Sequence, residues 1–221
     1  MRGAGSLWII AFLSIALQGC VGGTGGILGG GDEIEVPEWE TGDWWLFTFS
    51  TPDFFDDSAK LVVATVDQEE GGTAYMLGIS SEEEARRHAV LNHNPFLGRI
   101  SHSNLGVFEN GVEQAVLSFP LSEKTWSFTL FEKDWTASAN INGKKAYVKA
   151  TSADGGSLTF AYDDDIKFIT SFVRVDSDGA ELLRISLAQS GSDHQGEVHF
   201  IRGRDLLCLL YTSDAADDTD S

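Results

Sequence analysis

Cysteine is scarce in this sequence. Its 221 residues include only two cysteines, Cys20 near the start and Cys208 near the end. The long stretch between them therefore contains no disulfide, and its stability depends on a hydrophobic core. Residues 41–206 are long enough to build one such core, so the sequence predicts a single domain there.

Basic residues are also few. The chain has 15 lysines and arginines against 34 aspartates and glutamates, which gives a formal net charge of −19. A surface this acidic repels the phosphates of nucleic acids, so the composition excludes a nucleic-acid-binding protein. Cationic partners, divalent metals and a salty exterior are all compatible with it.

Recognisable catalytic motifs are missing. The sequence contains no G-x-S-x-G, H-E-x-x-H or C-x-x-C motif, and these are the patterns typical of common hydrolases, zinc proteases and redox enzymes. The many carboxylates are no evidence for a glycoside hydrolase either, because a chain with so many acids always places some pair at a separation suited to that reaction. We therefore expect no cofactor and a protein that is not an enzyme. An enzyme without a recognisable motif is the alternative.

Long apolar runs are absent as well. The run from Leu7 to Leu17 is interrupted only by Ser14 and follows the positively charged Arg2. It is shorter than the ~20 residues that a membrane-spanning helix needs. Its length is typical of an export signal, which we place at residues 1–19.

The signal ends in Leu17-Gln18-Gly19-Cys20, which resembles the lipobox of bacterial and archaeal lipoproteins. The resemblance implies cleavage before Cys20, attachment of a lipid to its thiol, and an extracytoplasmic domain tethered to a membrane. An ordinary signal peptide followed by a free cysteine is the alternative.

A tether and an acidic lead-in follow at residues 20–40. Seven of the ten residues from Gly22 to Gly31 are glycine, which is typical of a flexible linker. At the other end, Cys208 to Asp218 reads CLLYTSDAADD and resembles the translation of a sequencing-library adapter. We therefore expect residues 207–221 to be a non-native tail and the natural domain to be truncated near Leu206. A genuine acidic tail is the alternative.

Alternation of apolar and polar residues dominates the part between these ends. Residues 60–66 are apolar on both faces and predict a central strand, and Ser81-Glu82-Glu83-Glu84 predicts the start of one short helix near 81–91,. Hairpin turns separate the later strands, at Asn110-Gly111, Asn142-Gly143, Asp154-Gly155-Gly156 and Asp178-Gly179,. The sequence thus predicts a mainly β fold: an antiparallel meander that forms a strongly curved sheet, an open barrel or a sandwich.

One turn contains a second resemblance. Residues 119–126 read FPLSEKTW, which is similar to a phrase of β-rich, uncharacterised lipoproteins. Trp126, Phe128 and Leu130 alternate with polar residues, and Trp135 begins the next strand in the same way,. We therefore expect Trp126 and Trp135 on one apolar face, with Trp126 at the centre of it.

Two adjacent tryptophans are the candidate ligand-binding residues. Successive side chains of a strand point to opposite faces, so either Trp44 or Trp45 must leave the main core. An outward tryptophan can stack on a sugar ring. Coverage by the lead-in that contains Trp39 is the alternative.

The candidate metal ligands form no recognised metal-binding motif. Asp163, Asp165, Asp176 and Asp178 provide the oxygen ligands that calcium prefers, but ordinary turn chemistry explains them equally. His88, His93 and His102 are spaced loosely for zinc, and solvated histidines are the alternative.

Three classes of function stay open from the sequence. The first is a membrane-tethered, non-enzymatic β-domain that binds a ligand or scaffolds a surface assembly, with the ligand unknown. The second is a carbohydrate-binding module that uses an exposed tryptophan. The third is an enzyme that no motif reveals.

The tail can be tested by deletion. Removal of residues 207–221 is expected to leave the melting temperature unchanged, because these residues interrupt the strand pattern and offer no second apolar face. Circular dichroism melts of the full and shortened chains make the comparison. A clear drop in the melting temperature would mean that the tail packs against the domain.

Overall fold

β-Strands make up most of the part of the chain that is described. The computed structural model describes residues 33–53, 57–67, 74–85, 94–109 and 111–199. These residues belong to a compact unit that begins at Gly31. Cys20, the glycine-rich tether, His88, His93 and the tail lie outside the described residues.

The strands form one antiparallel sheet. The first half of the chain contributes β1 (Trp44–Ser50), β2 (Asp57–Asp67), β3 (Ala74–Ile79), β4 (Gly98–Ser101), β5 (Val107–Glu109) and β6 (Val112–Gln114). The second half contributes β7 (Thr125–Leu130), β8 (Lys133–Asn142), β9 (Lys145–Ser152), β10 (Ser157–Asp163), β11 (Phe168–Val175) and β12 (Glu181–Gly191).

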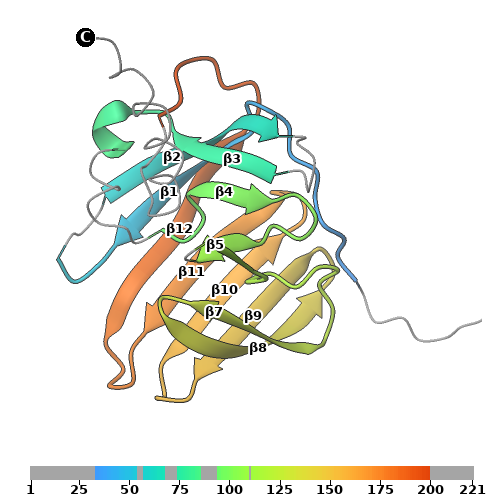
Figure 1. Cartoon of the computed structure of the whole chain (residues 1–221), viewed down its shortest axis with the longest axis vertical. Helices are drawn as coiled ribbons and strands as arrows, with labels where there is room; N and C mark the ends of the chain where they lie inside the picture. The colour runs from blue at the N-terminus through green and yellow to red at the C-terminus, as the bar shows by residue number, and fades with distance from the viewer. Residues whose placement is uncertain (1–32, 54–56, 68–73, 86–93, 110, 200–221) are drawn as a thin grey trace, which may run out of the picture. The chain divides into compact units, whose positions relative to one another are not determined.

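Two meanders join at the middle of the sheet. The strand order is β6-β5-β4-β3-β2-β1-β12-β11-β10-β9-β8-β7, so the last strand returns to pair with the first (Figure 1). All ladder pairs within it are antiparallel, as hairpin connections require,. The predicted antiparallel meander is therefore confirmed.

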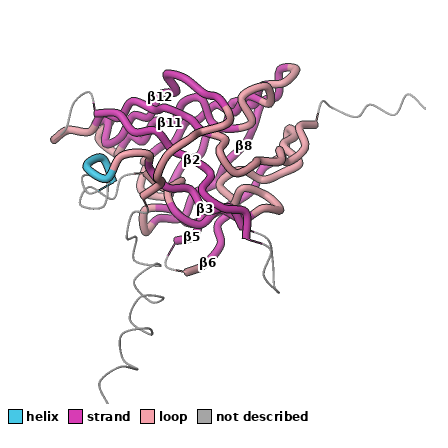
Figure 2. Tube along the Cα trace, turned by 90° about the horizontal axis from the view of Figure 1, so that it is seen from above, coloured by secondary structure: helices cyan, strands magenta, loops and turns pink. Residues whose placement is uncertain are grey.

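Side chains connect the two outermost strands, β6 and β7. Gln114 Oε1 accepts the backbone N–H of Thr129 at 2.7 Å, and the indole of Trp126 donates to the carbonyl of Ala115 at 3.0 Å. These bonds satisfy edge groups that a flat sheet would leave exposed. The sheet thus curls into a nearly closed barrel. Figure 2 shows its strands from above.

Burial follows the predicted alternation. Along β9, Ala146, Val148 and Ala150 are buried, whereas Tyr147 and Lys149 are exposed. The run 61–63 in β2 is buried on both faces, and this strand lies between β1 and β3. A strand apolar on both faces is confirmed to be central.

The predicted helix begins where the sequence indicates. The hydroxyl oxygen of Ser81 accepts the backbone N–H of Glu84 at 3.3 Å, and the Ser81 carbonyl accepts that of Ala85 at 2.9 Å. Ser81 is therefore the N-cap. Residues 82–85 are helical, and the rest of the range 81–91 lies outside the described residues.

The acidic lead-in contributes to the core. Ile34 exchanges two backbone hydrogen bonds with Leu121, and Trp39 is only 3% exposed. The ring centroid of Trp39 lies 4.9 Å from those of Trp45, Tyr75 and Phe168. Charged and apolar residues alternate in this segment, so its apolar side faces inward.

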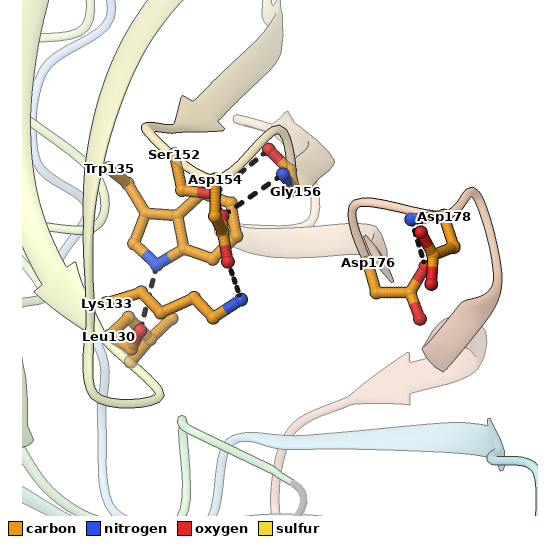
Figure 3. Close-up of polar contacts among 8 residues, drawn as sticks. All are labelled: Leu130, Lys133, Trp135, Ser152, Asp154, Gly156, Asp176 and Asp178. Carbon is orange, nitrogen blue, oxygen red and sulfur yellow. Dashed lines mark hydrogen bonds and ion pairs between the residues drawn. The ribbon is translucent and has the colours of Figure 1, made fainter.

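The two strand tryptophans share the inward face but differ in depth. Trp135 is 1% exposed and donates to the carbonyl of Leu130 at 2.8 Å (Figure 3), whereas Trp126 is half-buried and packs against the margin of the core. The expectation that Trp126 occupies the centre is wrong, because β7 is an edge strand and its ring lies beside the neighbouring edge.

Among the described residues, no helix is long and apolar enough to span a membrane.

The depth difference predicts unequal effects of truncation. Trp135→Ala should lower the free energy of unfolding by ~3–5 kcal/mol, because it empties a fully buried site. Trp126→Ala should lower it by less, since its ring is partly solvated. Equilibrium urea unfolding of both variants measures the difference. Equal losses, or a larger loss for Trp126→Ala, would contradict this assignment of the core.

Candidate functional site

The two candidate tryptophans point to opposite sides of β1. Trp45 is 2% exposed, and its indole donates to the carbonyl of Ile166 at 3.0 Å inside the core. Trp44 is on the outer face and half-buried. The prediction that one of the pair leaves the core is confirmed, and Trp39 packs on Trp45 rather than on Trp44.

Neighbouring residues occupy the surroundings of the Trp44 ring. The Lys60 ammonium lies 4.5 Å from its centroid in a cation–π contact, and its indole donates to the Ser192 carbonyl at 3.3 Å,. The backbone of Gly191 lies so close that a β-carbon there would be 2.7 Å from Trp44 Cζ2. A ring held in this way offers little open surface for stacking on a sugar.

Two of the three carboxylates in the Asp163–Asp165 run are paired with lysines at the turn between β8 and β9. Lys145 Nζ lies 3.0 Å from the Asp163 carboxylate, and Lys144 forms an ion pair with Asp165. These hydrogen bonds raise the pKa of Lys145 and of Lys144. The carboxylates that calcium would need therefore already have cationic partners.

Asp176 and Asp178 form a turn. One carboxylate oxygen of Asp176 accepts the backbone N–H groups of Asp178 at 2.9 Å and Ala180 at 2.8 Å, as Figure 3 shows for the first of them. Such a bond pattern is ordinary turn chemistry. Within the described ranges, no group of three acidic, histidine or cysteine residues is placed to hold a metal ion.

Asp154, in the turn between β9 and β10, also has a defined set of partners. It contacts Lys133 and Ser152 and accepts the backbone N–H of Gly156 at 3.3 Å (Figure 3). The hydrogen bond from Lys133 lowers the pKa of Asp154, with Ser152 and Gly156 adding to the effect. This carboxylate is ionised at neutral pH and fixes the turn between β9 and β10.

The buried tyrosines do not supply a base. Burial raises the pKa of Tyr75 and of Tyr162, so both phenols stay protonated at neutral pH,. The Tyr75 hydroxyl accepts the backbone N–H of Trp39 at 3.0 Å, and its ring centroid lies 4.8 Å from that of His102. Both tyrosines therefore belong to the packing of the interior.

A different aromatic residue is exposed. Tyr147 is 51% exposed on the outer face of β9, between two neighbouring strands. It pairs with Asn140 on β8 and Ala161 on β10, and Lys149 pairs with Ser138 and Thr159 on the same strands. We call these six positions the Tyr147 face: Ser138, Asn140, Tyr147, Lys149, Thr159 and Ala161.

The Tyr147 face carries no acidic residue, although the chain has 34 of them. Among the residues that the structure describes, Lys149 forms no ion pair, whereas Lys145 is paired with Asp163. These six positions therefore carry one positive charge, on Lys149, together with hydroxyl and amide groups, and Glu123 accepts a hydrogen bond from Asn140 at their margin. Sequence reasoning missed Tyr147, although its place among lysines in the alternating segment KAYVKATS indicated an outward ring,.

The sequence matches no protein-family model, and its comparison with curated proteins gives no match.

The ion pairs of Asp163 and Asp165 with lysines predict that calcium does not stabilise the protein. Millimolar calcium chloride is expected to leave the melting temperature unchanged, because binding would first have to break the ion pairs of Asp163 and Asp165. Calorimetric melts with calcium and with matched sodium chloride measure this. A calcium-specific rise in melting temperature that Asp163→Asn abolishes would establish a site at this turn.

Proposed function

We propose that this chain is an extracytoplasmic protein, anchored to a membrane by a lipid on Cys20, whose β-domain binds a partner without catalysing a reaction. The observation that carries the binding function is the Tyr147 face, where an exposed aromatic ring lies among polar side chains and beside Lys149, which forms no ion pair with any described residue. The sequence Leu17-Gln18-Gly19-Cys20 supports the anchor.

A rigid strand suits a binding surface. β9 pairs along its length with β8 and β10, so the backbone beneath Tyr147 and Lys149 is fixed before any ligand arrives. A tyrosine has only two side-chain torsions and loses little conformational entropy when it is immobilised. Preorganisation of this kind increases affinity, because less freedom is lost on binding.

The polarity of the face limits the type of partner. Four of its six positions carry hydroxyl, amide or ammonium groups, and its single aromatic ring carries a hydroxyl as well. A lipid surface or a large apolar protein partner would need a broader apolar patch. A hydrophilic, hydrogen-bonding ligand fits these groups better.

The anchor is tested with a matched pair of cysteine variants. Cys20→Ala should abolish incorporation of an alkyne-tagged fatty acid and move the exported chain into the aqueous phase of a detergent partition. Cys208→Ala is the control, because it removes the other thiol and should retain the label. A wild-type chain without label, or a Cys20→Ala chain that keeps it, would overturn the lipid anchor.

A further inference from the structure

We infer that the Tyr147 face is a binding site for an acidic glycan, a polysaccharide whose sugar rings carry carboxylates. This inference rests on the proposed binding function and specifies its ligand. Three properties of the face lead to it: an exposed ring, a cation that has no acidic partner in the described part of the chain, and a surrounding set of hydroxyl and amide groups.

The ring provides a stacking surface. The cross-strand neighbours of Tyr147 are Asn140 and Ala161, whose side chains are shorter than a phenol, so the ring rises above them. Both faces of a sugar ring expose C–H groups, which pack against the electron-rich face of an aromatic ring. The opposite arrangement holds at Trp44, where Lys60 and Gly191 occupy the ring's surroundings.

The cation selects the charge of the ligand. Lys149 lies two residues after Tyr147 on the same face, which places the two side chains ~7 Å apart along the strand. A sugar stacked on the ring can thus direct a carboxylate from itself or its neighbour toward the ammonium group. Lys145 contributes less charge, because Asp163 lies 3.0 Å from its Nζ.

The net charge of the chain does not prevent this binding. Coulomb interactions in water are screened over ~8 Å at physiological ionic strength, so distant carboxylates act weakly at the Tyr147 face. Of the acids near β9, Asp154, Asp163 and Asp165 are each paired with a lysine. Glu123 accepts the hydrogen bond of Asn140 at the margin of the face. Lys149 is therefore the cation of the face that has no acidic partner among the described residues.

The polar neighbours complete the site. Ser138 and Thr159 flank Lys149 on the adjacent strands, and Asn140 flanks Tyr147. The Asn140 amide donates to Glu123 at 3.3 Å, which leaves its carbonyl oxygen as an acceptor for a sugar hydroxyl,. Three strands ~4.8 Å apart span ~10 Å, which is about the length of two sugar rings.

Affinity electrophoresis of the full chain in detergent micelles tests the inference. The chain migrates through native gels that contain polygalacturonate, neutral dextran or dextran sulfate, and retardation is measured against polymer concentration. The wild type should be retarded by polygalacturonate and not by dextran. Its retardation should weaken as the salt concentration rises.

Four variants separate stacking from charge. Tyr147→Ala and Lys149→Gln should each weaken the binding of polygalacturonate about tenfold, and Tyr147→Phe should stay within about twofold of the wild type. Lys60→Gln is the matched control, because it removes one positive charge from β2, which β1, β12, β11 and β10 separate from β9, and it should bind as the wild type does. Thermal melts check that each variant is folded.

Several results would contradict glycan binding, and each has a different meaning. Absence of retardation by polygalacturonate overturns the inference, and so does equal retardation by neutral dextran. Equal retardation by dextran sulfate that Tyr147→Ala does not change would reveal only non-specific attraction to polyanions. The lipid label on Cys20 is read in the same preparations, so loss of the glycan site with the label intact rejects this inference and leaves the anchor standing.

Discussion

Burial of Trp39 is the constraint on which the barrel depends most directly. Its backbone N–H is bonded to the Tyr75 hydroxyl on β3, and its indole donates to the Lys167 carbonyl beside β11. The ring also packs on Trp45 of β1 and on Phe168. One side chain from the lead-in thus ties together strands from both meanders, and an aromatic cluster of this size supplies much of the apolar burial that a chain without a core disulfide needs.

Closure of the sheet depends on side chains at the opposite side of the strand order. Gln114 and Trp126 connect β6 with β7 without a regular ladder of backbone bonds. The lead-in meets the same region through the hydrogen bonds of Ile34 with Leu121. The two edges of the sheet are therefore joined by side-chain hydrogen bonds and by packing of the lead-in. The outer face of β8, β9 and β10 takes no part in this closure.

Local patterns predicted local structure well. The hairpin turns at Asn142-Gly143, Asp154-Gly155-Gly156 and Asp178-Gly179 follow from residue spacing alone and are confirmed, whereas Asn110 of the fourth turn lies outside the described residues. The burial of 61–63 on both faces and the cap at Ser81 are confirmed as well. The pairing of β1 with β12 joins residues more than a hundred positions apart, so no turn signal reports it. The sequence also could not predict that Trp126 is only half-buried, because the alternating pattern is the same in an edge strand and in a central strand. The exposure of Tyr147 followed from alternation, but a lone tyrosine gives no motif.

The inner and outer faces of β9 differ sharply in what they contact. Inside, Ala146 and Ala150 are fully buried, and Ala137 lies opposite Ala150 on β8. Small residues there leave room for large neighbours such as Tyr162, which pairs with Ala146 and is fully buried, so the strand is fixed by close packing,. Outside, the same alternation leaves the neighbouring positions unconstrained by the core. Several acidic residues are held in turns by lysines or backbone N–H groups, as Asp165 and Asp176 are, so the outer positions of β9 itself carry Tyr147 and Lys149 rather than acids.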